Sequence, residues 1–142
     1  RSTPLYSSAA SDVYKRQPKT DSGATLRAYK VSKRIDDDIS TCSLAISVEH
    51  KDGLITSARI ASGGMSEIPK RAFHCEASLI GAEWSERAFL EAAKRMGEDF
   101  KPISDARASD LYRLTVSKNL LSRYWLEMNT QTDFSLRVHD YG

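Results

Sequence analysis

The sequence predicts a two-layer α+β fold, in which a short antiparallel sheet of about three strands is backed by about three helices. Strand-like alternation of apolar residues occurs between Leu26 and Ile60, and helix-like periodicity follows it between Lys70 and Met128. Strands followed by helices favour such a layered domain over alternating parallel units. The pair Asp52-Gly53 lies between two strand-like segments and suits the positive backbone angles of a tight hairpin turn.

The strands are expected where apolar and polar residues alternate. A short strand is predicted over Leu26 to Val31. The strand before the hairpin turn has one apolar face, which consists of Cys42, Leu44, Ile46 and Val48. The inward face of the returning strand is expected to consist of Leu54, Thr56, Ala58 and Ile60.

The helices are expected after Gly63-Gly64, where the hairpin ends. A short helix is predicted over Lys70 to Ile80. Ser85 is a suitable N-cap for the next helix, and Gly97 is placed to terminate it. The apolar stripe of this second helix consists of Ala88, Phe89, Ala92, Ala93 and Met96. The longest helix is predicted over Ala108 to Met128. Its inward face is expected to consist of Leu111, Leu114, Leu121, Trp125 and Met128.

Residues 1–17 are expected to be foreign to the protein. Ser7 to Gln17 have the sequence SSAASDVYKRQ, which is the translation of a transposase adapter used to prepare sequencing libraries. The alternative is a polar natural N-terminus that is too poor in apolar residues to order. The rest of the chain divides into a connector (18–26), one domain (27–129) and a C-terminal tail (130–142). We expect the natural sequence to begin near Pro18, as the last part of a longer chain.

Composition excludes several classes of function. The chain has 21 Lys and Arg against 19 Asp and Glu; residues 1–17 hold three of these cations and one of these acids, so 18 of each remain. A neutral chain without a basic stripe gives no support for nucleic-acid binding. Without a run of about 18 apolar residues, no membrane span is expected. We expect a cytoplasmic protein in which Cys42 and Cys75 are reduced core residues. Neither cysteine belongs to a Cys-x-x-Cys pair, so iron–sulfur and zinc sites are not expected.

Four segments carry a resemblance to a known family. They are YKVSKRIDDDIS (29–40), ARIASGGMSEIPKRA (58–72), DARASDLYR (105–113), and NLL followed by RYWLE (119–127). In this order they resemble the C-terminal part of the FAD-binding domain in the iron–sulfur/FAD small subunit of xanthine dehydrogenases. That domain is similar to the C-terminal domain of carbon monoxide dehydrogenase flavoproteins. The resemblance implies a short antiparallel sheet backed by three helices, which agrees with the patterns above.

The resemblance also implies cofactor-binding roles for Lys30 and Asp37. In the family, the lysine that matches Lys30 contacts the flavin, and an ammonium there stabilises the negative charge of reduced flavin. Asp37 matches an acid that lies near the flavin and influences NAD access. The local sequence alone favours a solvated lysine on an edge strand. For Asp36 to Asp38, the local sequence favours a solvated loop that pairs with Lys33 and Arg34. A site for a hard cation is less favoured, because the further oxygen ligands that it needs are missing.

Two other features favour structural roles. Gly63-Gly64 lacks the Gly-x-Gly-x-x-Gly spacing of a phosphate cradle, so a turn or a close backbone approach is expected. Arg107 and Arg113 are expected to pair with Asp105 or Asp110, and contact with a neighbouring subunit is the alternative. The sequence assigns no catalytic residue and no metal ligand.

The resemblance finally implies a parent enzyme of several parts. In the family, a purine is hydroxylated at a molybdenum cofactor in a large partner subunit, and electrons pass through 2Fe-2S clusters to FAD and then to NAD. The chain would be a fragment of the FAD-binding subunit of such a hetero-oligomer, inactive by itself. One alternative is the flavoprotein subunit of a carbon monoxide dehydrogenase or an aromatic-CoA reductase. An alternative of another class is a standalone, non-catalytic binding or assembly module.

Overall fold

The computed structural model describes residues 24–34 and 38–130 of the chain. The adapter-like residues 1–17, most of the connector, and the tail after Thr130 lie outside the described residues. The described part is a four-stranded antiparallel sheet of order β1-β2-β3-β4 with three helices, which confirms the predicted α+β class and adds one strand. The elements are β1 (Thr25–Val31), β2 (Cys42–Lys51), β3 (Leu54–Gly63), β4 (Lys70–Arg71), α2 (Phe73–Leu79), α3 (Glu86–Asp99) and α4 (Asp110–Asn129).

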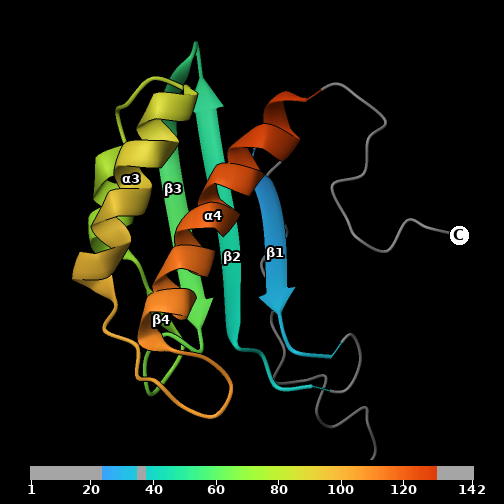
Figure 1. Ribbon diagram of the computed structural model, residues 1–142. Coiled ribbons are helices and arrows are strands. Elements are labelled where there is room, and N and C mark those ends of the chain that lie inside the picture. Colours follow the sequence, from blue (N-terminus) through green and yellow to red (C-terminus); the bar gives the residue numbers. More distant parts are fainter. Residues whose placement is uncertain (1–23, 35–37, 131–142) are drawn as a thin grey trace, which may run out of the picture.

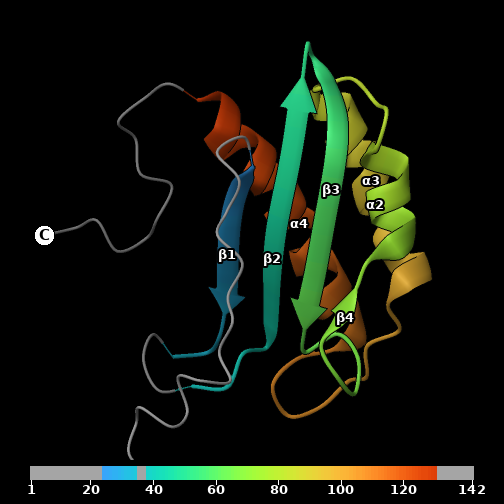
Figure 2. The same ribbon diagram turned by 180° about the vertical axis from the view of Figure 1, so that it is seen from behind.

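All three helices lie on one face of the sheet (Figures 1 and 2), so the sheet has a helix-covered face and an opposite, open face. On the covered face, α4 packs against β2 and α2 packs against β3, while α3 contacts both of these helices. The apolar face predicted for β2 is buried there, as expected. The rest of the buried core includes Ile55, Ile60, Met65, Leu79, Phe89, Met96, Leu121 and Tyr124.

The predicted hairpin turn is confirmed. Asp52 and Gly53 have φ angles of 52° and 79°, which are the positive values that a tight turn between antiparallel strands requires. The predicted first strand is also present, because β1 pairs with β2 along its whole length.

The inward face predicted for the returning strand is partly wrong, because β3 contains a β-bulge. The register of β2 against β3 shifts between Glu49 and His50, which leaves Thr56 as an extra residue in β3. A one-residue shift moves every following side chain to the other face of a strand. Ile55 is therefore buried, whereas Leu54 and Thr56 are exposed.

The helix predicted over residues 70–80 begins later than expected. Lys70 and Arg71 instead form β4, the edge strand that pairs with β3. The N–H of Ala72 then donates to the carbonyl of Ile60 at 2.8 Å. These backbone hydrogen bonds keep the chain in the sheet, so α2 starts immediately after Ala72.

α3 has the predicted cap and apolar stripe, but it continues past Gly97. The Oγ of Ser85 accepts a hydrogen bond from the N–H of Ala88 at 3.4 Å. The buried residues of the predicted stripe are Phe89, Ala92, Ala93 and Met96. A Cβ added at Gly97 would meet nothing within 4 Å, so this glycine lies inside the helix without a steric need for it.

Ser109 is the N-cap of α4, and its Oγ accepts the N–H of Tyr112 at 3.2 Å. Its predicted inward face is partly wrong, because Leu111 is 71% exposed. The buried residues of the helix are Arg113, Ser117, Leu120, Leu121 and Tyr124. Arg113 and Tyr124 occupy inward positions with polar partners, which a search for apolar periodicity does not detect.

The predictions for the cysteines are confirmed, because Cys42 and Cys75 are both free and buried. Burial raises the pKa of the Cys42 thiol. Burial also raises the pKa of the Cys75 thiol, to about 12, so both thiols are neutral at pH 7. Among the described helices, none combines the length and the apolar character that a membrane crossing requires.

The carboxylate of Asp99, at the end of α3, caps the start of α2. Its Oδ1 accepts the N–H of His74 at 2.9 Å, and its Oδ2 accepts the N–H of Cys75 at 3.0 Å. The Nδ1 of His74 also lies 2.9 Å from Oδ1. Burial by itself would raise the pKa of Asp99, but these hydrogen bonds outweigh it and hold the pKa below its ordinary value. Because Ala72 at the N-cap has no side-chain acceptor, Asp99 supplies one from a distant part of the chain.

Asp99→Ala is expected to lower the free energy of unfolding by about 1–3 kcal/mol, since it removes the acceptor of two N–H groups. Urea unfolding at pH 7 measures the change. The matched control is Glu98→Ala, which removes only an exposed pair with Arg95 and is expected to cost less than about 0.5 kcal/mol. Because the folded pKa of Asp99 is depressed, its contribution is present at neutral pH and is lost as the pH falls below about 4. Equal destabilisation by both variants would contradict the capping role.

Candidate functional site

Lys30 lies on the open face of the sheet, near the end of β1. It pairs with Ser43 in β2, which in turn pairs with Gly63 in β3. Side chains alternate between the two faces of a strand, and Cys42 and Leu44 point into the core. Ser43 and Lys30 therefore point away from the helices. Within the described part of the chain, Lys30 is exposed and forms no ion pair.

The neighbouring Tyr29 fixes β1 from the covered side. Its Oη donates a hydrogen bond to Oε2 of Glu127 in α4 at 2.8 Å. The Nε of Arg123 donates to Oε1 of the same carboxylate at 2.7 Å, and its guanidinium lies 5.4 Å from the centre of the tyrosine ring. Burial, reinforced by the bond to Glu127, raises the pKa of Tyr29, so the phenol remains a donor. These contacts hold the strand to α4 while Lys30 is presented on the opposite face.

Of the acidic residues 36–38, the structure describes only Asp38; Asp37, the other predicted site residue, lies outside the described residues. The Asp38 carboxylate accepts the N–H groups of Arg34 at 3.0 Å and Ile39 at 2.9 Å. The backbone hydrogen bond from Arg34 is the main cause that lowers the pKa of Asp38. Asp38 therefore acts within its own loop. Among residues 24–34 and 38–130, no group of three or more potential metal-ligating side chains occurs.

Three loops meet where β1 ends, at the lower end of Figure 1, and we call this region the loop end. The described parts of these loops are residues 32–34 and 38–41 between β1 and β2, residues 64–69 between β3 and β4, and residues 100–109 between α3 and α4. The Nζ of Lys33 donates to the carbonyl of Ala106 at 2.8 Å, which joins the first of these loops to the third.

The guanidinium of Arg113, in the first turn of α4, lies between the three loops. Its Nη1 donates to the carbonyls of Thr41 and Gly64, each at 2.6 Å, and its Nη2 donates to Oδ1 of Asp105 at 2.7 Å. The predicted pairing with Asp105 is thus confirmed, and Arg107 lies 3.6 Å from the same carboxylate. Arg113 is the one buried cation of the described residues. Its Nε has no hydrogen-bond partner among them.

Asp105 is held in its ionised form. The N–H of Arg107 donates to its Oδ1 at 2.8 Å, and the N–H of Ala108 donates to the same oxygen at 3.1 Å. The bond from Arg107 and then the guanidinium of Arg113 lower the pKa of Asp105 to about 2. The carboxylate therefore keeps its charge at any physiological pH, so the pair with Arg113 is a fixed ionic contact rather than an acid–base couple.

Gly64 shows the close backbone approach that was predicted for Gly63-Gly64. Its φ is 76°, and an added Cβ would lie 2.7 Å from the carbonyl oxygen of Thr41 and 3.3 Å from Nη1 of Arg113. A side chain at this position would separate the two loops whose carbonyls accept hydrogen bonds from the same Nη1 atom of Arg113.

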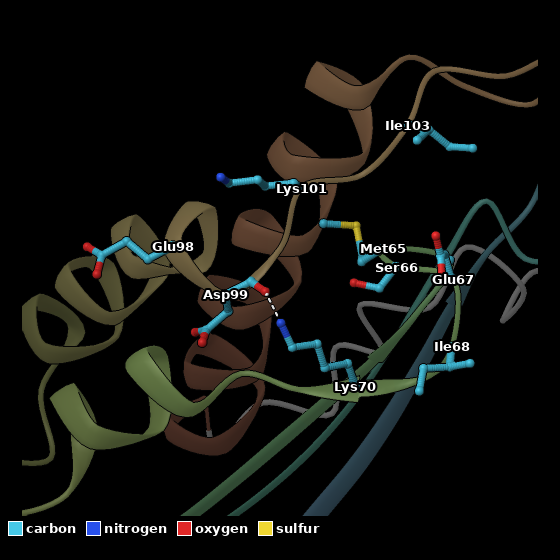
Figure 3. A pocket seen from close by; sticks show the side chains of 10 residues that line it. Met65, Ser66, Glu67, Ile68, Lys70, Glu98, Asp99, Lys101 and Ile103 are labelled. Atoms are coloured by element: carbon cyan, nitrogen blue, oxygen red, sulfur yellow. Dashed lines mark hydrogen bonds between the residues drawn. The ribbon is translucent and has the colours of Figure 1, made fainter.

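A cavity of about 510 Å³ opens between β4, the loop 64–69 and the end of α3. Figure 3 shows the Nζ of Lys70 directed at the carbonyl of Asp99, at 2.9 Å, on one side of this cavity. The carboxylate of Asp99 is already bound to α2, and Lys30 is not among the described lining residues. A second cavity, of about 380 Å³, borders the end of β1; its lining includes Val31, Lys33, Thr41 and Ser109.

Known proteins resemble the chain over most of its length. The family model of the CO dehydrogenase flavoprotein C-terminal domain matches residues 27–128. A xanthine dehydrogenase of Emericella nidulans is 36% identical over 136 residues, which are 94% of this chain and 10% of that protein. A nicotinate hydroxylase of the same organism is 32% identical over 117 residues, which are 79% of this chain and 9% of that protein. The glyceraldehyde dehydrogenase medium chain of Sulfolobus acidocaldarius is 29% identical over 100 residues, 70% of this chain and 36% of that protein.

Solved structures share the fold. The carbon monoxide dehydrogenase of Hydrogenophaga pseudoflava superposes with a TM-score of 0.69 at 24% identity, covering 75% of this chain and 37% of that chain. The quinoline 2-oxidoreductase of Pseudomonas putida 86 superposes with a TM-score of 0.65 at 25% identity, covering 73% and 36%. The chain therefore spans little more than a third of these solved chains and about a tenth of the fungal relatives.

The fold and the matched residues define a class of protein, the FAD-binding flavoproteins of the molybdenum hydroxylases. Their C-terminal domain is the part to which this chain corresponds. The chain belongs to the CO dehydrogenase flavoprotein C-terminal domain family. The resemblance found in the sequence is thereby confirmed.

The residues around Lys30 fit one side of a flavin site. The row of Lys30, Ser43 and Gly63 offers an ammonium and a hydroxyl beside a position without a side chain, where an added Cβ would lie 2.7 Å from the Ser43 Oγ. The edge of a planar ring can approach such a surface closely. These residues fit one edge of the ring and not a complete FAD site, because the sequence lacks the Gly-x-Gly-x-x-Gly spacing of a dinucleotide cradle.

Sequence reasoning missed the contacts that join distant segments. The pair of Tyr29 with Glu127 spans 98 positions, and the bond from Arg113 to the carbonyl of Thr41 spans 72. The only available signals were the acidic partner Asp105 and the adjacent glycines 63 and 64. Backbone carbonyls are common to all residues, so no sequence pattern marks the two that Arg113 binds.

Gly64→Ala is expected to lower the free energy of unfolding by about 1–3 kcal/mol, because it places a side chain at a positive φ against Thr41. Gly97→Ala is the matched control. It is expected to raise the free energy of unfolding by about 0.5–1 kcal/mol, because Gly97 lies inside a helix with open space around it. Urea unfolding of both variants tests the assignment, and the same sign for the two changes would disprove the close approach at Gly64.

Proposed function

We propose that this domain forms one wall of the FAD site in the iron–sulfur/FAD subunit of a molybdenum-containing xanthine dehydrogenase. The observation that carries the proposal is the position of Lys30, an exposed lysine without an ion pair among the described residues, on the open face of the sheet. The 36% identity to the xanthine dehydrogenase of Emericella nidulans, over 94% of this chain, supports the xanthine branch.

The proposed role of Lys30 is electrostatic. Bound FAD supplies the electron-transfer chemistry, and the reduced form of its ring is more negative than the oxidised form. An ammonium near the ring favours the reduced form, since opposite charges attract more strongly at a partly desolvated interface than in bulk water. Lys30 is available for this role because the two described carboxylates nearest to β1 have other partners: Glu127 accepts a hydrogen bond from Tyr29, and Asp38 accepts one within its own loop.

Asp37 is proposed to lie beside the flavin and to influence the access of NAD. Its immediate neighbour Asp38 anchors the loop through the N–H groups of Arg34 and Ile39. NAD is the proposed electron acceptor of the parent enzyme.

The parent enzyme is proposed to be a cytoplasmic hetero-oligomer. A large partner subunit would hold the molybdenum cofactor and hydroxylate the purine, and 2Fe-2S clusters in the flavin-binding subunit would carry electrons to FAD. The short coverage of the relatives supports a longer parent, because this chain matches only 36–37% of the solved flavoprotein chains. We assign no catalytic residue to the domain and expect it to be inactive by itself.

Two further candidates remain within the same class. A nicotinate hydroxylase is favoured by the 32% identity over 79% of the chain. A carbon monoxide dehydrogenase flavoprotein is favoured by the family match and by the shared fold.

A standalone binding module is the candidate of another class. This candidate predicts that the codons for residues 1–17 occur in the genome directly upstream of Pro18. Sequencing the source DNA upstream of Pro18 tests that candidate directly.

The full flavoprotein, assembled with its partner subunit, separates the enzyme candidates. Bleaching of the flavin absorbance by xanthine, and its recovery on addition of NAD, is the result expected of the xanthine branch. Bleaching by nicotinate or carbon monoxide, without bleaching by xanthine, would identify that compound and not xanthine as the substrate. A full-length chain that binds no flavin would refute the proposal.

Lys30→Met is expected to lower the two-electron reduction potential of the flavin in the full flavoprotein. A loss of about 1.4 kcal/mol in the interaction with the reduced ring corresponds to a shift of about 30 mV. Lys51→Met, at the hairpin end of β2, removes the same charge from the other end of the sheet and is the matched control. Spectroscopic redox titration measures both potentials. Equal shifts for both variants would assign the effect to net charge and not to Lys30.

A further inference from the structure

Arg113 connects all three segments of the loop end through hydrogen bonds of defined geometry. Nη1 donates to the carbonyls of Thr41 and Gly64, each at 2.6 Å, and Nη2 donates to the carboxylate of Asp105 at 2.7 Å. The side chain is 5% exposed. The planar fork of a guanidinium fixes the relative positions of its partners, which the compact ammonium of a lysine does not.

The contact with Thr41 reaches the segment that carries Lys30. The N–H of Thr41 donates to the carbonyl of Val31 at 2.8 Å, which closes the loop between β1 and β2. Val31 directly follows Lys30 in β1. A displacement of Thr41 therefore moves the end of the strand from which Lys30 projects.

A second link joins the same loop to the loop 100–109. Lys33 donates to the carbonyl of Ala106, the residue that follows Asp105. Asp105 itself is fixed by two backbone N–H groups and by Arg113. The loop between β1 and β2 is thus held at two points against one rigid segment, of which Arg113 is the buried centre.

The position of Gly64 shows that the three-loop contact is close. The absence of a side chain allows its carbonyl and that of Thr41 to reach the same Nη1 atom. Because these bonds are made with backbone atoms, they constrain the course of the loops rather than the rotamers of their side chains. This is the property expected of a group that sets the position of a neighbouring site.

We propose that Arg113 is a positioning residue, which holds residues 38–41, 64–69 and 100–109 together and thereby places the end of β1, with Lys30, against the flavin. The flavin part of this inference rests on the function proposed above. The loop part stands on the hydrogen bonds alone. The two parts can therefore be tested separately.

The first measurement is amide hydrogen exchange of the 142-residue chain, with Arg113→Lys as the variant. Exchange at residues 38–41 and 64–69 is expected to become at least about tenfold faster, while exchange in the β2–β3 hairpin stays unchanged. The matched control is Arg107→Lys, which changes an exposed arginine that lies 3.6 Å from the carboxylate of Asp105. This control is expected to leave exchange in both regions unchanged. Unchanged loop exchange, or faster exchange throughout the chain, would overturn the positioning role.

The second measurement is the flavin reduction potential and the visible circular dichroism of the full flavoprotein. Arg113→Lys is expected to change both, although it retains the charge, whereas Arg107→Lys leaves both unchanged. If Arg113→Lys does not fold, Asp105→Ala replaces it, because this change removes the acceptor of Nη2 and leaves both carbonyl bonds.

The outcomes distinguish this inference from the proposed function. Faster loop exchange without a change in the flavin signals would refute the positioning of the flavin by Arg113, while the Lys30 assignment would still be judged by Lys30→Met. A flavin response to Arg113→Lys with none to Lys30→Met would retain the positioning role and refute the electrostatic role of Lys30.

Discussion

The burial of one face of the sheet by three helices is the constraint on which the rest of the structure depends. Strand side chains alternate between faces, so the burial of Cys42, Leu44 and Ile46 against the helices sends Ser43 and its partner Lys30 to the other side. A shift of one residue in the pairing of β1 would place Lys30 in the core. The contact of Tyr29 with α4 opposes such a shift, because it requires the tyrosine to remain on the covered face. The same packing that stabilises the domain thus determines which charge is presented on the open face.

The regular parts of the fold could be predicted from the sequence, because local pattern and tertiary packing agree there. The alternation in β2, the turn at Asp52-Gly53 and the cap at Ser85 all depend on residues within one element. The errors arose where pairing with another segment decided the local structure. The bulge at Thr56 reverses the faces of β3, and the bond from Ala72 to Ile60 extends the sheet into a segment with a helical pattern.

The site was predictable to a different degree. The resemblance identified Lys30, and the structure adds its exposure, its face and its freedom from ion pairs among the described residues. The spacing of charges also anticipated the pair of Arg113 with Asp105. The two carbonyls that complete the environment of Arg113 were not predictable, because they come from loops that only the folded sheet and α4 bring together. A sequence can name the charged partners of a contact, whereas backbone partners become visible only with the tertiary structure.

Arg113 and Lys30 illustrate how a domain can separate structure from function. Burial of a charge is costly unless it is paired, and Arg113 is paired through both Nη atoms with a carboxylate of depressed pKa and two carbonyls. Its field is largely neutralised by Asp105, so it has little charge left to offer a ligand. Lys30 is exposed and pays no such desolvation cost, and its charge is not balanced by any described neighbour. The free charge therefore lies on the open face, and the neutralised charge lies among the loops that hold that face in place.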